Sequence, residues 1–243
     1  MDRIGGHRNV GEIETESAAV AAQAVFRLPP VIWHSRNKLA YLIYGVPLAV
    51  LYQAVNWWPV VEPRGLPMTW LDQVIPFVPA LLPVYLVYLP LYWWTAARQR
   101  NDRDLNRIIY GVYFQLLLCL PFFVLFPVRM PRELFYRPEQ YPWVDFFWRW
   151  FDAPNNCFPS LHVANCLLFV QFNWALPRRG LYAFAFVAII ASTVLVKQHY
   201  VADLAAGAVV YLTCRWFLDR LEVTGLSADG WDLRRLTIPR AVG

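Results

Sequence analysis

Long apolar runs alternate along the chain with shorter segments that are basic, polar or rich in proline. About 20 apolar residues are enough for a helix to span the hydrocarbon core of a bilayer. The pattern predicts an all-α polytopic membrane protein in which residues 39–220 form one bundle of six transmembrane helices. The six predicted spans cover residues 39–58, 77–97, 108–126, 159–174, 181–196 and 201–217. Pro79, Pro83 and Pro90 predict kinks in the second span, which neighbouring helices tolerate.

The segments on either side of the bundle are polar. Residues 1–38 carry Glu12, Glu14 and Glu16 where a signal peptide would need basic residues, so they predict a cytoplasmic segment that is disordered or lies on the membrane surface. Residues 221–243 are predicted to form a cytoplasmic tail.

Two loops are predicted to contain interfacial helices. The stretch from Thr69 to Asp72 has the residue types of a helix start. Between Arg132 and Asn156, aromatic residues recur at helical spacing, namely Trp143, Phe146, Phe147, Trp150 and Phe151. This second helix is predicted either to lie on the membrane or to pack against the mouth of the bundle.

The composition agrees with a membrane protein and argues against a nucleic-acid-binding or a disulfide-rich protein. Hydrophobic residues make up 58% of the chain, and the formal net charge is +5. No nucleic-acid-binding motif accompanies this charge, so nucleic acid is not an expected partner. The four cysteines are scattered and form neither a disulfide framework nor a zinc-binding spacing.

The distribution of basic residues predicts how the bundle is oriented, because cytoplasmic loops collect lysine and arginine. The richer side holds eleven basic residues: Arg27, Arg36, Lys38, Arg98, Arg100, Arg103, Arg107, Arg178, Arg179, Arg215 and Arg220. The other side holds six: Arg64, Arg129, Arg132, Arg137, Arg149 and Lys197. Both termini are therefore predicted to be cytoplasmic. The end of the third span, the start of the fourth and the junction of the fifth and sixth then share the extracytoplasmic face.

The chemistry-bearing residues fall on that same face. His199 precedes Asp203 by four residues, a spacing at which a helical carboxylate can reach back and orient an imidazole. The other polar candidates predicted to share the face are Ser160, His162, Arg129, Arg132 and Lys197. Two imidazoles, several cations and a helix start suit a phosphate group. An anionic substrate is therefore expected.

These residues allow more than one chemistry. One histidine could attack phosphorus while the other protonates the leaving oxygen, and then neither a metal nor a cofactor is required. Alternatively, His162, His199 and Asp203 could ligate a metal, although the nearby cations oppose this. Ser160 could also act as an acyl-transfer nucleophile, which would leave the cations unexplained. The simplest alternative is a buried His–Asp pair that has a structural role and no catalytic one.

Two sequence motifs resemble a known family. Phe158-Pro-Ser-Leu-His162, together with Ser192 seven residues before His199 and Asp203 four after it, resembles the second and third signature motifs of the type-2 phosphatidic acid phosphatase superfamily. The resemblance implies a six-helix membrane enzyme that acts on lipid phosphates. It implies His199 as a nucleophile that forms a phosphohistidine, Asp203 as its orienting partner and His162 as the general acid, with Ser160 and Ser192 at the phosphate.

The chain also departs from the family pattern. Leu161 stands in place of the usual glycine, Thr193 stands in place of the arginine beside Ser192, and no lysine stands seven residues before Arg129 or Arg132. Lys197 is expected to substitute for the missing arginine, and Arg129 or Arg132 to fill the first-motif role.

Further details resemble the inositol phosphorylceramide synthase branch, which transfers a phosphoryl head group to an alcohol. They are Asp72 with residues 75–79, the turn at residues 127–132, and Lys197-Gln-His-Tyr200. The expected function is hydrolysis of a lipid phosphate or phosphodiester at the extracytoplasmic face of a membrane, with the bacterial inner membrane as the expected location. Head-group transfer is the first alternative, and a non-catalytic binding or transport module is the second. The expected partners are the lipid substrate and the bilayer.

Overall fold

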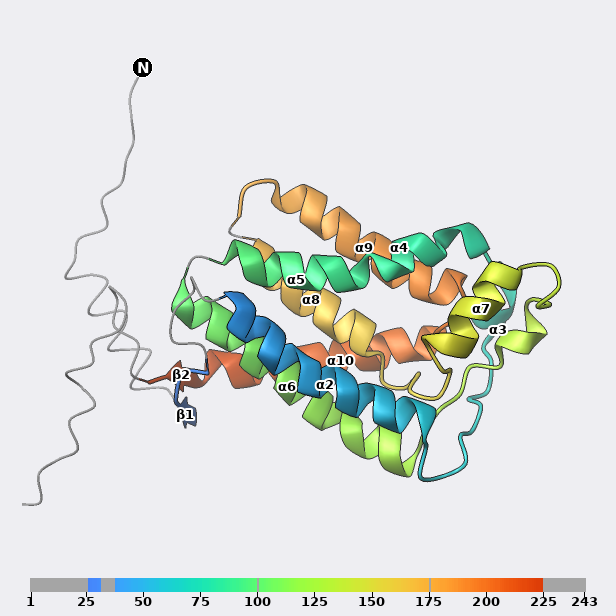
Figure 1. Cartoon of the computed structure of the whole chain (residues 1–243), viewed down its shortest axis with the longest axis horizontal. Coiled ribbons are helices and arrows are strands. Elements are labelled where there is room, and N and C mark those ends of the chain that lie inside the picture. Colours follow the sequence, from blue (N-terminus) through green and yellow to red (C-terminus); the bar gives the residue numbers. More distant parts are fainter. Residues whose placement is uncertain (1–25, 32–37, 100, 175, 225–243) are drawn as a thin grey trace, which may run out of the picture.

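The computed structural model describes residues 26–31, 38–99, 101–174 and 176–224 (Figure 1). Residues 1–25 and 225–243, which include most of the predicted surface segment and tail, lie outside the described residues. The described chain is mostly helical, which confirms the predicted class at this level. The helices are α2 (Lys38–Trp57), α3 (Trp70–Val74), α4 (Leu82–Leu86), α5 (Tyr88–Arg98), α6 (Asp102–Leu125), α7 (Pro142–Trp150), α8 (Leu161–Asn173), α9 (Arg179–Leu195) and α10 (Val201–Asp219).

Among the described residues, three helical segments are long and apolar enough to cross a membrane: Pro79–Arg98, α6 and α10. The first of these consists of a 3-10 turn (Pro79–Leu81) followed by α4 and α5. The break between α4 and α5 falls at Val87, three residues before Pro90, which has no N–H to donate to the carbonyl of Leu86. The apolar helices α8 and α9 are shorter, so the six-span count stays a prediction.

Helix α8 lies at the centre of the bundle and packs against α5, α6, α9 and α10 (Figure 1). Its side chains Ala164, Leu168 and Phe169 are fully buried. Apolar side chains on the outer helices are instead exposed, such as Leu117 on α6 and Phe184 on α9. Outer faces with few polar side chains are suited to contact with lipid.

Short elements close the two ends of the bundle. The strands β1 (Phe26–Leu28) and β2 (Leu221–Val223) pair in parallel at one end, an addition that the all-α prediction lacked. At the other end lie α3 and α7 (Figure 1). The helix start predicted at Thr69 is confirmed, since Thr69 and Asp72 form a capping box.

The aromatic helix α7 combines features of both predicted placements. Val144 and Trp148 are buried in a cluster with Tyr85 and Val196, so one face packs on the mouth of the bundle. Trp143, Phe146 and Trp150 stay exposed on the other face. Packing fixes the helix, and the exposed aromatic rings remain available to a membrane interface.

Helix α10 packs closely against the start of α8 at Gly207. A Cβ atom built there would lie 2.5 Å from the carbonyl oxygen of Ser160 and 2.9 Å from Cβ of Val163. A backbone oxygen cannot move aside as a flexible side chain can. The absence of a side chain at Gly207 therefore allows the second turn of α10 to pack against the start of α8.

Replacing Gly207 with alanine is expected to push α10 away from α8. Overpacking of this kind destabilises by about 1–3 kcal/mol. The measurement is the melting temperature of the purified protein in detergent. Gly180→Ala on α9 is the matched control, because a Cβ there meets nothing within 4 Å. Equal melting temperatures for the two variants would contradict the close approach.

Candidate active site

The site is built where the chain enters α10. His199 precedes the helix, and Asp203 lies in its first turn. Oδ2 of Asp203 accepts a hydrogen bond from the backbone N–H of Tyr200 at 2.9 Å and lies 3.1 Å from Nδ1 of His199. The sequence predicted this pair from the spacing of two helical residues. The structure instead forms it through the helix cap, because the carboxylate that satisfies the free N–H also reaches the ring.

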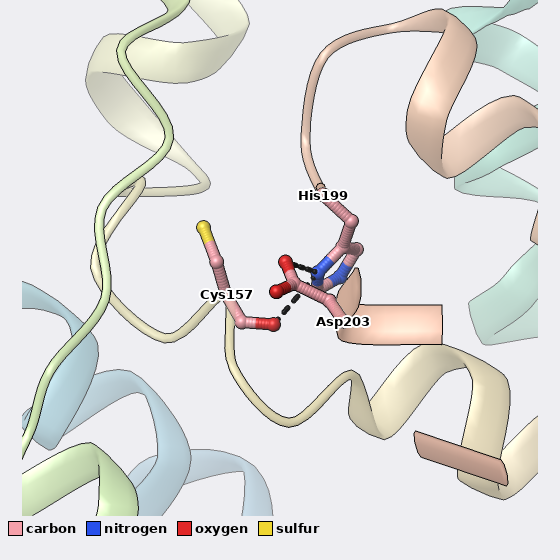
Figure 2. A group of neighbouring side chains, drawn as sticks. All are labelled: Cys157, His199 and Asp203. Carbon is pink, nitrogen blue, oxygen red and sulfur yellow. Dashed lines mark hydrogen bonds and ion pairs between the residues drawn. The ribbon is translucent and has the colours of Figure 1, made fainter. Parts of the chain in front are cut away.

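Two acceptors surround Nδ1 of His199. Besides Asp203, the backbone oxygen of Cys157 lies 2.8 Å from this nitrogen. Figure 2 shows the carboxylate and this carbonyl against the ring, with the sulfur of Cys157 directed away from it. Since both neighbours accept hydrogen bonds, the proton of the neutral ring belongs on Nδ1. Nε2 then carries the free lone pair.

Nε2 of His199 faces the second motif. It lies 3.2 Å from Oγ of Ser160 and 3.3 Å from Nδ1 of His162. Ser160 is the N-cap residue of α8, and its Oγ accepts from the N–H of Val163. The hydroxyl proton of Ser160 is therefore free to point at Nε2. The structure thus brings Ser160, His162, His199 and Asp203 together.

His162 connects this cluster to a cavity. Its ring lies between the rings of Tyr85 and Tyr88, with both centroids 4.8 Å away. The cavity has a volume of about 460 Å³ and is lined by α2, α4, α5, α6, α7 and α8. Most of its lining is apolar. His162 is thus the one member of the four-residue cluster, within the described chain, that also lines the cavity.

The predicted phosphate-binding residues have other partners. Nζ of Lys197 donates to the backbone oxygens of Asp72 at 2.8 Å and Ile75 at 2.6 Å, and it lies over the ring of Phe135. Burial lowers the pKa of Lys197. The hydroxyl of Ser192 donates to Ile189 within α9. Lys197 and Ser192 thus have hydrogen-bond partners within the protein, and their expected contacts with phosphate stay a prediction.

The two arginines differ in their surroundings. Arg129 is half-exposed and pairs with Glu133 at 2.9 Å. Arg132 is buried, stacks on Trp148 and donates to the side chain of Gln198, the residue before His199. Its Nε is buried without a hydrogen-bond partner among the residues described. Arg132 is thus the better placed of the two for a phosphate near His199.

Cys157, His199 and Asp203 bring potential metal ligands within 4.8 Å of one another. Their hydrogen bonds fit a different arrangement. Sγ of Cys157 lies 3.0 Å from the oxygen of Pro154 and 3.2 Å from that of Gln198, and both are acceptors for its proton. Burial raises the pKa of this thiol, which disfavours the thiolate that a metal would need. The cluster is better suited to holding the imidazole than to binding an ion.

Sequence reasoning missed Asp152, which lies just after α7 and lines the cavity. Asp152 is 6% exposed, and its carboxylate accepts from the hydroxyl of Tyr85 at 2.5 Å. Burial raises the pKa of Asp152, against the opposing effect of Arg132. In the sequence it appears only as a polar residue opposite an aromatic stripe, so no spacing singled it out.

The fold and the site together define a class of protein. It is a helical membrane protein in which a buried His–Asp pair faces a second histidine at the start of a helix. Comparison with family models matches residues 53–217, about two thirds of the chain, to the PAP2 superfamily. The chain belongs to this superfamily, which supports a phosphatase-type membrane enzyme. Comparisons with curated proteins and with solved structures found no match.

The two roles open to Lys197 predict different outcomes for Lys197→Met. Its contacts with the end of α3 predict a loss of about 1–3 kcal/mol of stability, because one buried and one partly buried carbonyl lose their donor. The KM for a phosphate substrate should stay unchanged. Melting temperature and steady-state kinetics in detergent measure both quantities. Arg129→Met is the control, since an exposed ion pair contributes little stability. A raised KM at an unchanged melting temperature would return Lys197 to the phosphate site.

Proposed function

We propose that this protein hydrolyses a lipid phosphate or phosphodiester through a phosphohistidine on Nε2 of His199. The observation that carries the proposal is the pair of acceptors at Nδ1, which leaves the lone pair on Nε2. This nitrogen faces Ser160 and His162 rather than solvent, since His199 is 2% exposed. A nucleophile needs both a free lone pair and a fixed direction.

The reaction balances with these residues alone. The Nε2 lone pair forms a bond to phosphorus as the ester P–O bond breaks, and His162 gives its proton to the leaving oxygen. Water then attacks phosphorus, its proton passes to His162, and the P–N electron pair returns to Nε2. Asp203 stays ionised and supports the positive charge that the His199 ring gains. Ser160 and Arg132 are the proposed contacts of the phosphate oxygens.

The cavity supports a lipid as the leaving group. It meets the reaction centre at His162, the proposed acid, and its lining beyond that point is mostly apolar. A hydrocarbon chain there would place its phosphoester oxygen beside the group that must protonate it. The same cavity could deliver an alcohol to the phosphohistidine in place of water. Head-group transfer to an alcohol, as in the inositol phosphorylceramide synthase branch, is therefore the second candidate.

A six-span topology with the site on the extracytoplasmic face belongs to the proposal. The pairing of β1 with β2 supports an even number of crossings, because it holds the segments before α2 and after α10 together. Helix α8 has 13 residues and is about 20 Å long, shorter than a bilayer core. The buried residues Ala153, Cys157 and Ser160 extend its path as non-helical backbone enclosed in protein.

His199→Ala is expected to abolish phosphate release from lipid phosphates, because it removes the Nε2 lone pair that is proposed to attack phosphorus. The measurement is inorganic phosphate released by purified protein, with acceptor alcohols such as inositol or glycerol supplied in a parallel reaction. Phosphate release without a new phospholipid supports hydrolysis, and a new phospholipid supports transfer. If His199→Ala keeps full activity, the chain is not an enzyme of this mechanism.

His162→Ala separates the acid from the nucleophile. Loss of a general acid should lower turnover of an alkyl phosphate by about 100-fold or more. An aryl phosphate leaves without protonation and should lose less than about tenfold. The measurement is kcat/KM for the two substrates. Equal losses on both would remove His162 from that role.

A further inference from the structure

The cavity lining includes a few polar residues besides His162, among them Asp152, Gln53, Asn165 and Tyr85. Tyr85 contacts the ring of His162 and binds Asp152, which brings that carboxylate near the reaction centre. The remaining walls are mostly apolar, including Leu48, Leu89 and Phe147. A pocket of this kind orients a ligand through its few polar groups.

Asp152 is held firmly in this lining. The hydroxyl of Tyr85 donates to Oδ2, and Nδ2 of Asn56 lies 3.4 Å from Oδ1. Asn56 also binds both the N–H and the side chain of Asn155, which ties the loop after α7 to α2. An ionised carboxylate can accept about four hydrogen bonds, so Asp152 keeps unused capacity.

Gln53 adds a second acceptor beside it. Nε2 of Gln53 donates to the backbone oxygen of Phe151. This hydrogen bond fixes the orientation of the side-chain amide, because its nitrogen must face that oxygen. Its Oε1 is buried and has no hydrogen-bond partner among the described residues. Gln53 therefore presents an acceptor without a donor, beside a carboxylate that can accept more hydrogen bonds than the two it receives from Tyr85 and Asn56. Buried acceptors are unfavourable until a donor reaches them.

The charge balance favours a neutral donor. Arg132 donates to the backbone oxygen of Asp152 at 2.9 Å, so a cation already stands beside the carboxylate. A positively charged ammonium group on a ligand would be repelled by Arg132. A neutral hydroxyl or amide N–H group would not be repelled.

Tyr85 connects this acceptor pair to the reaction centre. Its ring contacts His162, and its hydroxyl binds Asp152. A ligand whose reacting oxygen lies at His162 would thus carry its neighbouring atoms past Asp152. The reacting oxygen itself must exchange its proton with His162, so the donor to Asp152 is a separate group.

We propose that Asp152 determines specificity by accepting a hydrogen bond from a hydroxyl or amide N–H next to the reacting oxygen of a lipid alcohol. The inference rests on the proposed function, because it takes His162 as the acid at the reacting oxygen. The lipid alcohol is either the leaving group of the substrate or an acceptor that competes with water.

The test compares ligands that differ only in the second donor. Long-chain 2-hydroxyalkyl phosphates and alkyl phosphates serve as substrates, and alkane-1,2-diols and 1-alkanols serve as acceptors. The wild-type protein should prefer the ligand with the second hydroxyl by about tenfold, the size of one net hydrogen bond. Preference in the first pair assigns the hydroxyl to the leaving alcohol, and preference in the second assigns it to the acceptor.

Asp152→Asn is the informative variant. Tyr85 donates its proton, so the amide oxygen should stay on that side and an NH2 group should replace Oδ1. The preference for the ligand with the second hydroxyl, taken as the ratio of kcat/KM values, should then fall to about one. Asp145→Asn on α7 is the matched control, because Asp145 pairs with Arg149 and does not line the cavity. It should keep the preference.

A binding measurement separates this inference from the proposed function. Thermal stabilisation of the wild type, Asp152→Asn and Asp145→Asn by the diol and the alkanol needs no turnover. If no lipid phosphate is hydrolysed but the diol preference is present and depends on Asp152, the proposed function fails while the role of Asp152 in binding the lipid alcohol is retained. A wild type without preference, or an Asp152→Asn variant that weakens both ligands equally, overturns the inference.

Discussion

One carboxylate oxygen holds the centre of this structure together. Oδ2 of Asp203 binds the free N–H at the start of α10 and the ring of His199. The backbone oxygen of the same residue accepts from the N–H of Ser160, which joins the start of α8 to α10. Both histidine-bearing segments are thus positioned by one residue. Because the pair also fixes the proton on Nδ1, the fold and the reactivity of His199 depend on the same contacts.

The sequence predicted the parts of this site that depend on local spacing and on the order of the helices. His199 and Asp203 are four residues apart, and alternation of the apolar runs places the segment bearing Ser160 and His162 at the same end. The helical class and the cap at Thr69 follow equally from local patterns. The phosphate-contact and catalytic roles of these residues stay proposals.

Other features depend on contacts that no local pattern encodes. Lys197 adopts a left-handed backbone with φ of 57°, and its amine meets carbonyls more than 120 residues earlier in the chain. Asp152 gains its importance from Tyr85 and Asn56, which lie on α4 and α2. The three-residue strands β1 and β2 are too short to produce a recognisable alternation, and they pair across nearly the whole chain. These features arise from tertiary packing.

The central claim is that Nε2 of His199 is the atom that bonds to phosphorus. Its most direct test is NMR of protein labelled with 15N-histidine, quenched in base during turnover of a lipid phosphate, with phosphorus coupling used to identify the modified nitrogen. The structure predicts a phosphohistidine on Nε2 of His199 that is absent in His199→Ala. Phosphorylation of Nδ1, or of Ser160, would contradict this account.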